Sequence, residues 1–246
     1  MQKVVAVVLC VMFAGIFSFC GKRMELESQI PCDCEDELYS YFGGEKDPLL
    51  GIILRTDYLF VGFEPHVQNA EIVEYIKKTG VFNPVHEKEI ERYSPNYPQL
   101  GYKSYLFVHT KKPLTCSQLR ECISMLEKSN IVSFANFAFC NSHAKYKTLT
   151  SFSEYFHVDV KNKYDLDDFY AVVQETNTQI VRQGSYTPES FILQANKYSK
   201  GNAPQMSIYF YETGKFALSY SIIWTNGIVD GKVYIYNPDK PKILEQ

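Results

Sequence analysis

Few side chains in this sequence have the types and spacing that catalysis requires. Cys116 stands at the start of an expected helix, where a thiol paired with a histidine could act as a nucleophile. A nucleophile needs its base within hydrogen-bond reach, and no spacing in the chain indicates such a pair. The histidines are scattered: His66, His86, His109, His143 and His157. We therefore predict no catalytic residues and no enzymatic activity.

The segment Cys32-Asp33-Cys34 has residue types that bind metals. Structural zinc sites use two ligand pairs of matching spacing, and no second pair is present. The acidic residues Asp33, Glu35, Asp36 and Glu37 offer oxygen ligands for calcium, but they lack the glycine turn of a calcium-binding loop. We predict an acidic tether at residues 21–37. We also predict no metal, no cofactor and no small-molecule substrate.

The composition limits the classes of partner. Charged residues make up 22% of the chain, the net charge is −3, and no basic stripe is present. This balance argues against nucleic acid as the partner. Aromatic residues make up 15% of the chain, and 19 of them are tyrosines, which suit sheet surfaces that are half buried and half wet.

The N-terminus has the anatomy of an export signal. One early lysine precedes an apolar run over residues 4–19, which has the length of a signal peptide. Cys20 ends the run and precedes Gly21 and a basic pair, the position of the lipidated cysteine in a lipoprotein precursor. Phe19 stands where a small residue is usual, so cleavage without lipidation and a retained anchor are the alternatives. Each alternative places the protein outside the cytoplasm: in the envelope with a lipid anchor in a bacterial membrane, or periplasmic or secreted.

An odd number of cysteines follows Cys20, so at least one of them is unpaired or intermolecular. They are Cys32, Cys34, Cys116, Cys122 and Cys140. Cys116 and Cys122 share an expected helix and lie about 9 Å apart along it, too far for a disulfide. We predict that Cys122 is a buried thiol.

The segment 202–223 has a second copy earlier in the chain. Asn202 and Gln205 have the spacing of a capping box, and Gly214 can end the helix in the left-handed conformation. In the earlier copy, Thr115 and Gln118 take the capping positions and Asn130 takes the exit. Apolar residues at helical spacing and then an alternating strand follow each cap. Two copies of one supersecondary unit are predicted.

Each unit reads in the order β-α-β-β-α-β, which predicts an α+β chain of two tandem ferredoxin-like sandwiches, antiparallel sheets with helices on one face. The first unit has strands near 58–63, 81–85, 104–109 and 131–139, and a long polar loop over 86–101. The second has strands near 155–160, 178–182, 191–195 and 216–222. The predicted organisation is a signal (1–20), an acidic linker (21–37), a first unit with an N-terminal hairpin (38–140), a linker (141–153), a second unit (154–224) and a tail with one short strand (225–246).

Two such units, with a helix that ends in E-T-G-K-F (212–216) and then a strand, resemble the propeptide domains of secreted subtilases. Tandem propeptide-like units of exported bacterial proteins are the nearest likeness, and it covers about residues 58–223. In that family the domain is a folding chaperone and inhibitor whose sheet face packs on the protease and whose C-terminal tail lies in the active cleft. The chain has none of the Asp, His and Ser motifs of a subtilase. The resemblance therefore implies a partner protease encoded elsewhere.

One strand carries the candidate partner-binding surface. Its larger residues alternate with smaller ones, and one of its faces must point away from the helices. The residues are Phe216, Leu218, Tyr220, Ile222 and Trp224. The alternatives for this face are contact between the two units, with sheet packed on sheet, and sugar binding through exposed tyrosines.

We thus expect a non-enzymatic, exported protein-binding module that acts through its sheet face and C-terminal tail on a subtilisin-like protease. The alternative is a structural or interaction lipoprotein of the cell surface that has no inhibitory role and binds another surface protein. A flexible, extended tail would favour inhibition, whereas a tail that folds back as an edge strand would favour the alternative.

Overall fold

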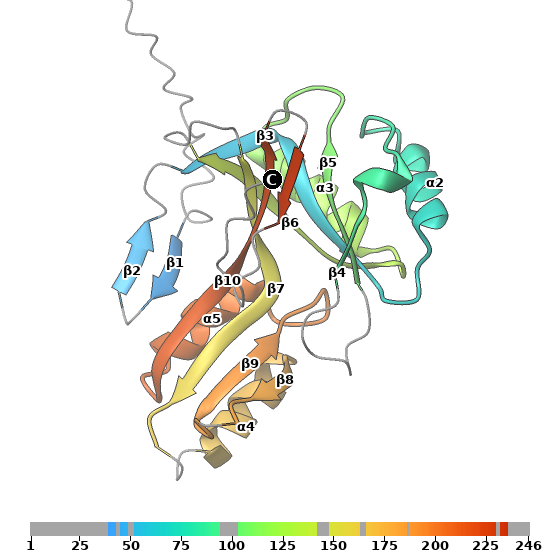
Figure 1. The fold of residues 1–246 in the computed structure, drawn as a ribbon. Helices are drawn as coiled ribbons and strands as arrows, with labels where there is room; N and C mark the ends of the chain where they lie inside the picture. Colours follow the sequence, from blue (N-terminus) through green and yellow to red (C-terminus); the bar gives the residue numbers. More distant parts are fainter. Residues whose placement is uncertain are drawn as a thin grey trace, which may run out of the picture. The chain divides into compact units, whose positions relative to one another are not determined.

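The chain is α+β, with an antiparallel sheet and four α-helices in the part that the computed structural model describes (Figure 1). That part comprises residues 39–42, 45–48, 52–93, 103–141, 148–162, 166–185, 187–229 and 232–235. All of these residues belong to one compact unit, residues 31–246. The predicted signal and the acidic linker lie outside the described residues.

The first half of the sheet contains four strands in the order β6-β3-β5-β4, all antiparallel to their neighbours. A hairpin of β1 (Tyr39–Phe42) and β2 (Glu45–Pro48) precedes it, as predicted. The elements of this half are β3 (Ile52–Phe63), α2 (Asn69–Thr79), the 3-10 helix η2 (Glu87–Glu89), β4 (Glu91–Tyr93), β5 (Lys103–His109), α3 (Cys116–Glu127) and β6 (Val132–Asn141).

The second half repeats this arrangement, with the strand order β10-β7-β9-β8 and antiparallel neighbours throughout. One further strand, β11 (Lys232–Ile235), pairs with the outer edge of β10. The other elements are β7 (Thr148–Val160), α4 (Leu166–Thr176), β8 (Gln179–Gln183), β9 (Ser190–Gln194), α5 (Ala203–Glu212) and β10 (Phe216–Val229). β7 begins inside the segment predicted as a linker, and β10 continues into the segment predicted as the tail.

The two halves join edge to edge. β6 pairs with the first part of β7, through Phe139 with Thr150 and Cys140 with Leu149, while the later part of β7 pairs with β9. The described strands β3 to β11 therefore form one nine-stranded sheet that forks along β7. Because the halves share a sheet, packing of sheet on sheet is not the way they meet.

Each half buries its own core between its sheet and its helices. In the second half this core contains Phe156, Phe169 and Phe210, none of which is exposed to solvent. In the first half, Leu59 and Val61 alternate along β3 with residues of the opposite face, and both are fully buried. Burying one such side chain contributes about 1.5–3 kcal/mol, so the period-two pattern of β3 and β7 decides which face the helices cover.

The prediction of a strand over residues 81–85 is wrong. Only Phe82 forms a bridge there, with Thr110. The N–H of Asn83 donates to the carbonyl of His109 at 2.8 Å as part of this bridge, and Pro84, which has no N–H, cannot extend the ladder. The strand that pairs with β5 is β4, which lies in the segment predicted as a polar loop.

Both predicted capping boxes are present. The Asn202 side chain accepts from the backbone N–H of Gln205 at 3.0 Å, and the Gln205 side chain accepts from the N–H of Asn202 at 3.0 Å. Thr115 and Gln118 form the same pair of bonds at 3.3 and 3.0 Å. Gly214 is left-handed, with φ of 71°. Asn130 is not, because α3 ends at Glu127 and its last turn closes through Ser129 N–H to the carbonyl of Leu126.

We expect Thr115→Ala and Asn202→Ala each to lower the free energy of unfolding by about 1 kcal/mol, because each leaves helical N–H groups without their acceptor. Urea unfolding of the full chain measures the effect. Ser124→Ala, at an exposed position inside α3, is the matched control and should not destabilise the protein. Equal losses at Ser124 and Thr115 would contradict a capping role.

Candidate interaction surface

A register shift divides the predicted surface between the two faces of the sheet. Phe216 pairs with Val160 and Leu218 pairs with Asp159, so β10 has one extra residue between these positions. Phe216 is 2% exposed and lies in the core beneath the helices, with its ring 5.3 Å from that of Phe210. Strict alternation along the strand would have kept Phe216 and Leu218 on one face.

Leu218, Tyr220 and Ile222 lie on the opposite, helix-free face and are half-buried. The serines between them point to the helices: the hydroxyl of Ser221 lies 3.0 Å from that of Ser207 on α5. The backbone of Trp224, further along β10, pairs with that of Ser151 on β7, but the Trp224 side chain lies outside the described residues. The structure therefore brings together three of the five predicted residues.

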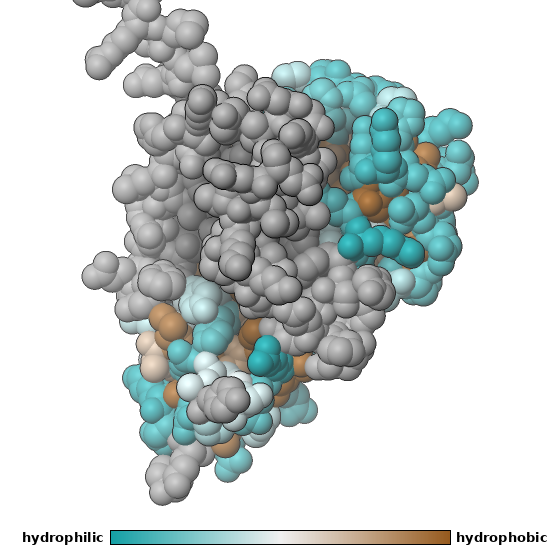
Figure 2. Space-filling model, viewed as in Figure 1, coloured by the Kyte–Doolittle hydropathy of each residue, from teal (hydrophilic) through white to brown (hydrophobic). Residues whose placement is uncertain are grey.

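Neighbouring strands complete this surface. By the strand register, Leu218 lies beside Asp159, Tyr220 beside His157, and His157 beside Ile192. We call the set the second-half face: His157, Asp159, Ser190, Ile192, Leu218, Tyr220 and Ile222. In Figure 1, α4 and α5 lie behind these strands, and in the same view Figure 2 shows hydrophobic and hydrophilic residues mixed over this half.

A polar cluster lies at the centre of the second-half face. Nε2 of His157 is 2.7 Å from Oδ1 of Asp159 and 3.1 Å from Oγ of Ser190, and Ser190 donates to the same carboxylate oxygen. The ring of Tyr220 stacks on His157 at 4.9 Å. Burial, and then the charge of Asp159, raise the pKa of Tyr220, which keeps its hydroxyl protonated.

Ser190, His157 and Asp159 have the residue types of an acyl-transfer triad but not its geometry. In a triad the serine and the carboxylate bind opposite ring nitrogens, whereas here both contact Nε2. The serine proton goes to the carboxylate, so the imidazole does not activate the hydroxyl. The cluster can accept hydrogen bonds from a bound partner and donate hydrogen bonds to it. Sequence reasoning missed it because its members, with Tyr220 stacked on them, come from three strands that the register brings together: β7, β9 and β10.

The equivalent face of the first half is covered. Phe60 and Tyr105 are 1% exposed and Phe134 is 4% exposed, and their rings lie within about 6 Å of one another. Gly62 lies directly beneath the Phe134 ring, which fills the space a side chain would need. The two halves thus share a strand order but differ in surface, and the part-exposed face is that of the second half.

A buried ion pair joins the halves where the sheet forks. Nζ of Lys103 on β5 is 3.0 Å from Oε1 of Glu154 on β7, and both side chains are buried. The hydroxyl of Tyr105 donates to the same oxygen at 3.2 Å. Burial first, and then the charge of Glu154, raise the pKa of Tyr105 well above its usual value. In the sequence, the one sign of this cluster is Glu154, the single charged residue in the segment S-F-S-E-Y-F (151–156).

Side-chain hydrogen bonds replace the strand ladder at the fork. Nδ2 of Asn136 donates to the carbonyl of Phe152 at 2.9 Å, and the hydroxyl of Ser151 donates to the carbonyl of Phe137 at 2.6 Å. A buried backbone carbonyl without a partner would cost about 1–3 kcal/mol. These bonds allow β6 and β7 to separate without leaving these two carbonyls unpaired.

The cysteines separate into bonded and free groups. Cys116 is disulfide-bonded, so it carries no free thiol. Cys122 is a free, buried thiol, as predicted, and Cys140 is free and half-buried. Cys20, Cys32 and Cys34 lie outside the described residues. Among the residues that the structure describes, no three His, Cys, Asp or Glu side chains gather in a way that could hold a metal ion.

No protein-family model matches the chain, and no curated protein matches it. Within the described ranges, the helices are all too short or too polar to cross a membrane.

Proposed function

We propose that this protein is an exported, non-enzymatic protein-binding module built from two tandem ferredoxin-like units similar to subtilase propeptides. The strand orders β6-β3-β5-β4 and β10-β7-β9-β8 support the two units, because each places the last strand of a β-α-β-β-α-β unit beside the first and the third beside the second. The capping boxes at equivalent places support their descent from one repeat.

The observation that carries the binding role is the second-half face. It combines half-buried apolar side chains with a stacked Tyr220 and a hydrogen-bonding cluster around His157. Amphipathic aromatic residues with apolar neighbours are what protein interfaces favour. The aromatic residues on the corresponding face of the first half are buried, so we place the partner on the second half.

The strand β11 favours a surface interaction role over protease inhibition. Its backbone folds back on β10, with Lys232 beside Val229 and Val233 beside Ile228. A cleft-bound tail must instead be extended and free to enter the protease. Inhibition of a subtilisin-like protease is therefore the second candidate, carried by the resemblance to propeptides.

Export with a lipid anchor at Cys20 belongs to the same proposal. The disulfide of Cys116 supports an oxidising compartment, because such bonds persist outside the cytoplasm. The membrane contact would then be the lipid at Cys20, and the acidic residues 21–37 would hold the folded part away from the bilayer.

The test uses a photo-crosslinking residue in the full chain, in its own cells. Incorporated at Leu218, it should give a discrete protein adduct. The matched control is incorporation at Tyr170, 47% exposed on α4, which should give none. Adducts at neither position, or equal adducts at both, would contradict the assignment of the second-half face.

A protease assay separates the two candidate roles. The purified full chain is added to a panel of subtilisin-like proteases, and residual activity is measured. We expect no inhibition, since β11 pairs with β10. Tight inhibition that is lost when residues 230–246 are removed would establish the second candidate instead.

A further inference from the structure

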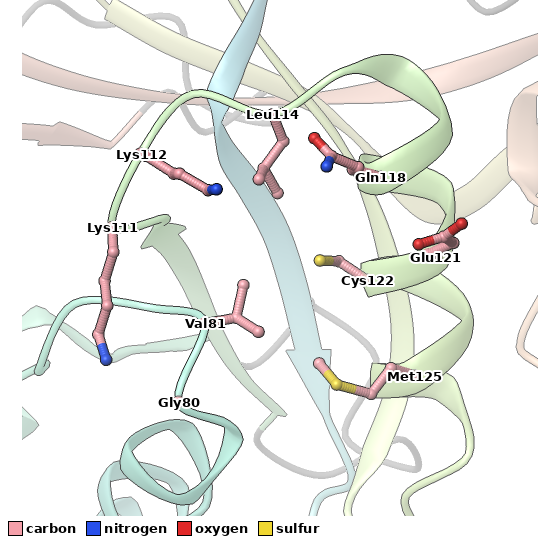
Figure 3. Close-up of a pocket in the computed structure, with 9 residues that line it drawn as sticks. All are labelled: Gly80, Val81, Lys111, Lys112, Leu114, Gln118, Glu121, Cys122 and Met125. Atoms are coloured by element: carbon pink, nitrogen blue, oxygen red, sulfur yellow. The ribbon is translucent and has the colours of Figure 1, made fainter.

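A cavity of about 590 Å³ lies in the first half, between the end of α2, the loop that follows β5, and α3 (Figure 3). Ligand pockets in proteins are commonly about 300–1,000 Å³. The cavity is separate from the second-half face, and its use does not depend on the function proposed above.

The floor of the cavity is apolar. The side chains of Val81, Leu114 and Met125 point into it and are half-buried, and Sγ of Cys122 points into it from α3 (Figure 3). A floor of branched and thioether side chains accommodates an unbranched hydrocarbon chain, which releases water from both surfaces. The apolar part of a ligand would therefore lie along α3.

The rim of the cavity is polar and favours an anion. Nζ of Lys112 lies over the floor, and the amide of Gln118 points to the same opening (Figure 3). Glu121 also lines the cavity, but its carboxylate points away from the opening. Lys112 forms no ion pair with any residue in the described part of the chain. A carboxylate at the rim would gain this ammonium and an amide donor.

We propose that this cavity binds a free, monomeric carboxylic acid with an unbranched alkyl chain, with the carboxylate at Lys112 and the chain on the floor beside Cys122. Lys111 also lines the cavity, but its side chain points away from the floor (Figure 3). The concave shape and the Lys112 ammonium therefore fit one chain and one head group. A lipid bilayer, by contrast, would need an exposed apolar or basic surface.

The thiol of Cys122 reports occupancy directly. Burial raises its pKa, and the nearby charge of Glu121 adds to this, so alkylation is slow and sensitive to access. Cys140 is the second free thiol of the described chain and lies on β6, away from the cavity. It serves as an internal control in the same sample.

The experiment measures alkylation of both thiols by N-ethylmaleimide in the full chain, by peptide mass, with and without dodecanoate at monomeric concentrations. We expect dodecanoate to slow the reaction of Cys122 at least about tenfold and to leave that of Cys140 unchanged. Unchanged rates at both thiols, or equal slowing at both, would overturn the proposal.

Variants and ligands test the two parts of the site. Lys112→Gln should weaken dodecanoate binding about fivefold, the effect of an exposed ion pair, while Lys128→Gln at the end of α3 should not change it. Met125→Trp should fill the floor and abolish protection of Cys122. Each methylene between octanoate and dodecanoate should tighten binding about fourfold.

A further measurement with lipid vesicles distinguishes binding of a free acid from binding to a membrane. Vesicles of phosphatidylglycerol should leave the alkylation rate of Cys122 unchanged. Protection by vesicles equal to that by dodecanoate would overturn the assignment of a free acid. Equal affinity of the Lys112→Gln variant and the unsubstituted protein for dodecanoate would overturn the placement of the carboxylate at Lys112.

Discussion

Lys103→Met is expected to lower the free energy of unfolding by about 3–5 kcal/mol, because it leaves the Glu154 carboxylate buried without its cation. The ion pair measures 3.0 Å, and both side chains are buried at the fork of the sheet. The second oxygen of Glu154 already has no hydrogen-bond partner in the described structure, so few other groups can compensate. Urea unfolding of the full chain measures the loss.

The double variant Lys103→Met with Glu154→Leu separates charge from packing. Replacing a whole buried pair by apolar residues is often neutral, so the double variant should regain most of the lost stability. Lys200→Met is the matched control, since Lys200 pairs with Glu175 at 2.6 Å on the surface and its loss should have little effect. A double variant as unstable as Lys103→Met would contradict an unpaired charge as the cause.

Gly62→Ala is expected to lower the free energy of unfolding by about 1–3 kcal/mol, the usual cost of overpacking. A Cβ at this position would lie under 3.0 Å from three atoms of the Phe134 ring. That ring is 4% exposed and contacts Phe60 and Tyr105, so it has little room to move. Thermal or urea unfolding gives the value.

A double-mutant cycle tests the mechanism. In a Phe134→Leu background the smaller side chain leaves room for the added methyl group, so Gly62→Ala should cost much less than in the unsubstituted chain. Gly80→Ala serves as the control, since a Cβ there meets no atom within 4 Å and its cost comes from the positive φ alone. The cost of Gly80→Ala should be the same in both backgrounds. If Gly62→Ala lowers the free energy of unfolding equally in the two backgrounds, contact with the Phe134 ring is not the cause of the loss.

The features that sequence reasoning predicted correctly are local. The capping boxes at Thr115 and Asn202 depend on residues three positions apart, and the left-handed Gly214 depends on one residue. The element order follows from period-two and helical spacing within short segments. The buried thiol of Cys122 followed from its place in the apolar stripe of one helix.

The features that it missed depend on pairing between distant strands. The strand β4 exists because β5 offers it an edge. Residues 81–85 form only the single bridge of Phe82 with Thr110, just past the end of β5. The bulge in β10 moves Phe216 into the core, although alternation alone kept it beside Leu218. In both cases a hydrogen-bonding partner many residues away decided the outcome.

The sequence by itself determined the two capping boxes, the helices that follow them and the strand periodicity, because these depend on dihedral preferences and on burial along short segments. The tertiary structure alone decided that the halves share one sheet, that Lys103 meets Glu154 at its fork, and that His157, Ser190 and Tyr220 form one cluster. These contacts join strands that lie far apart in the chain. Their free energy depends on register and on a shared low-dielectric interior, and neither of these exists until the sheet has formed.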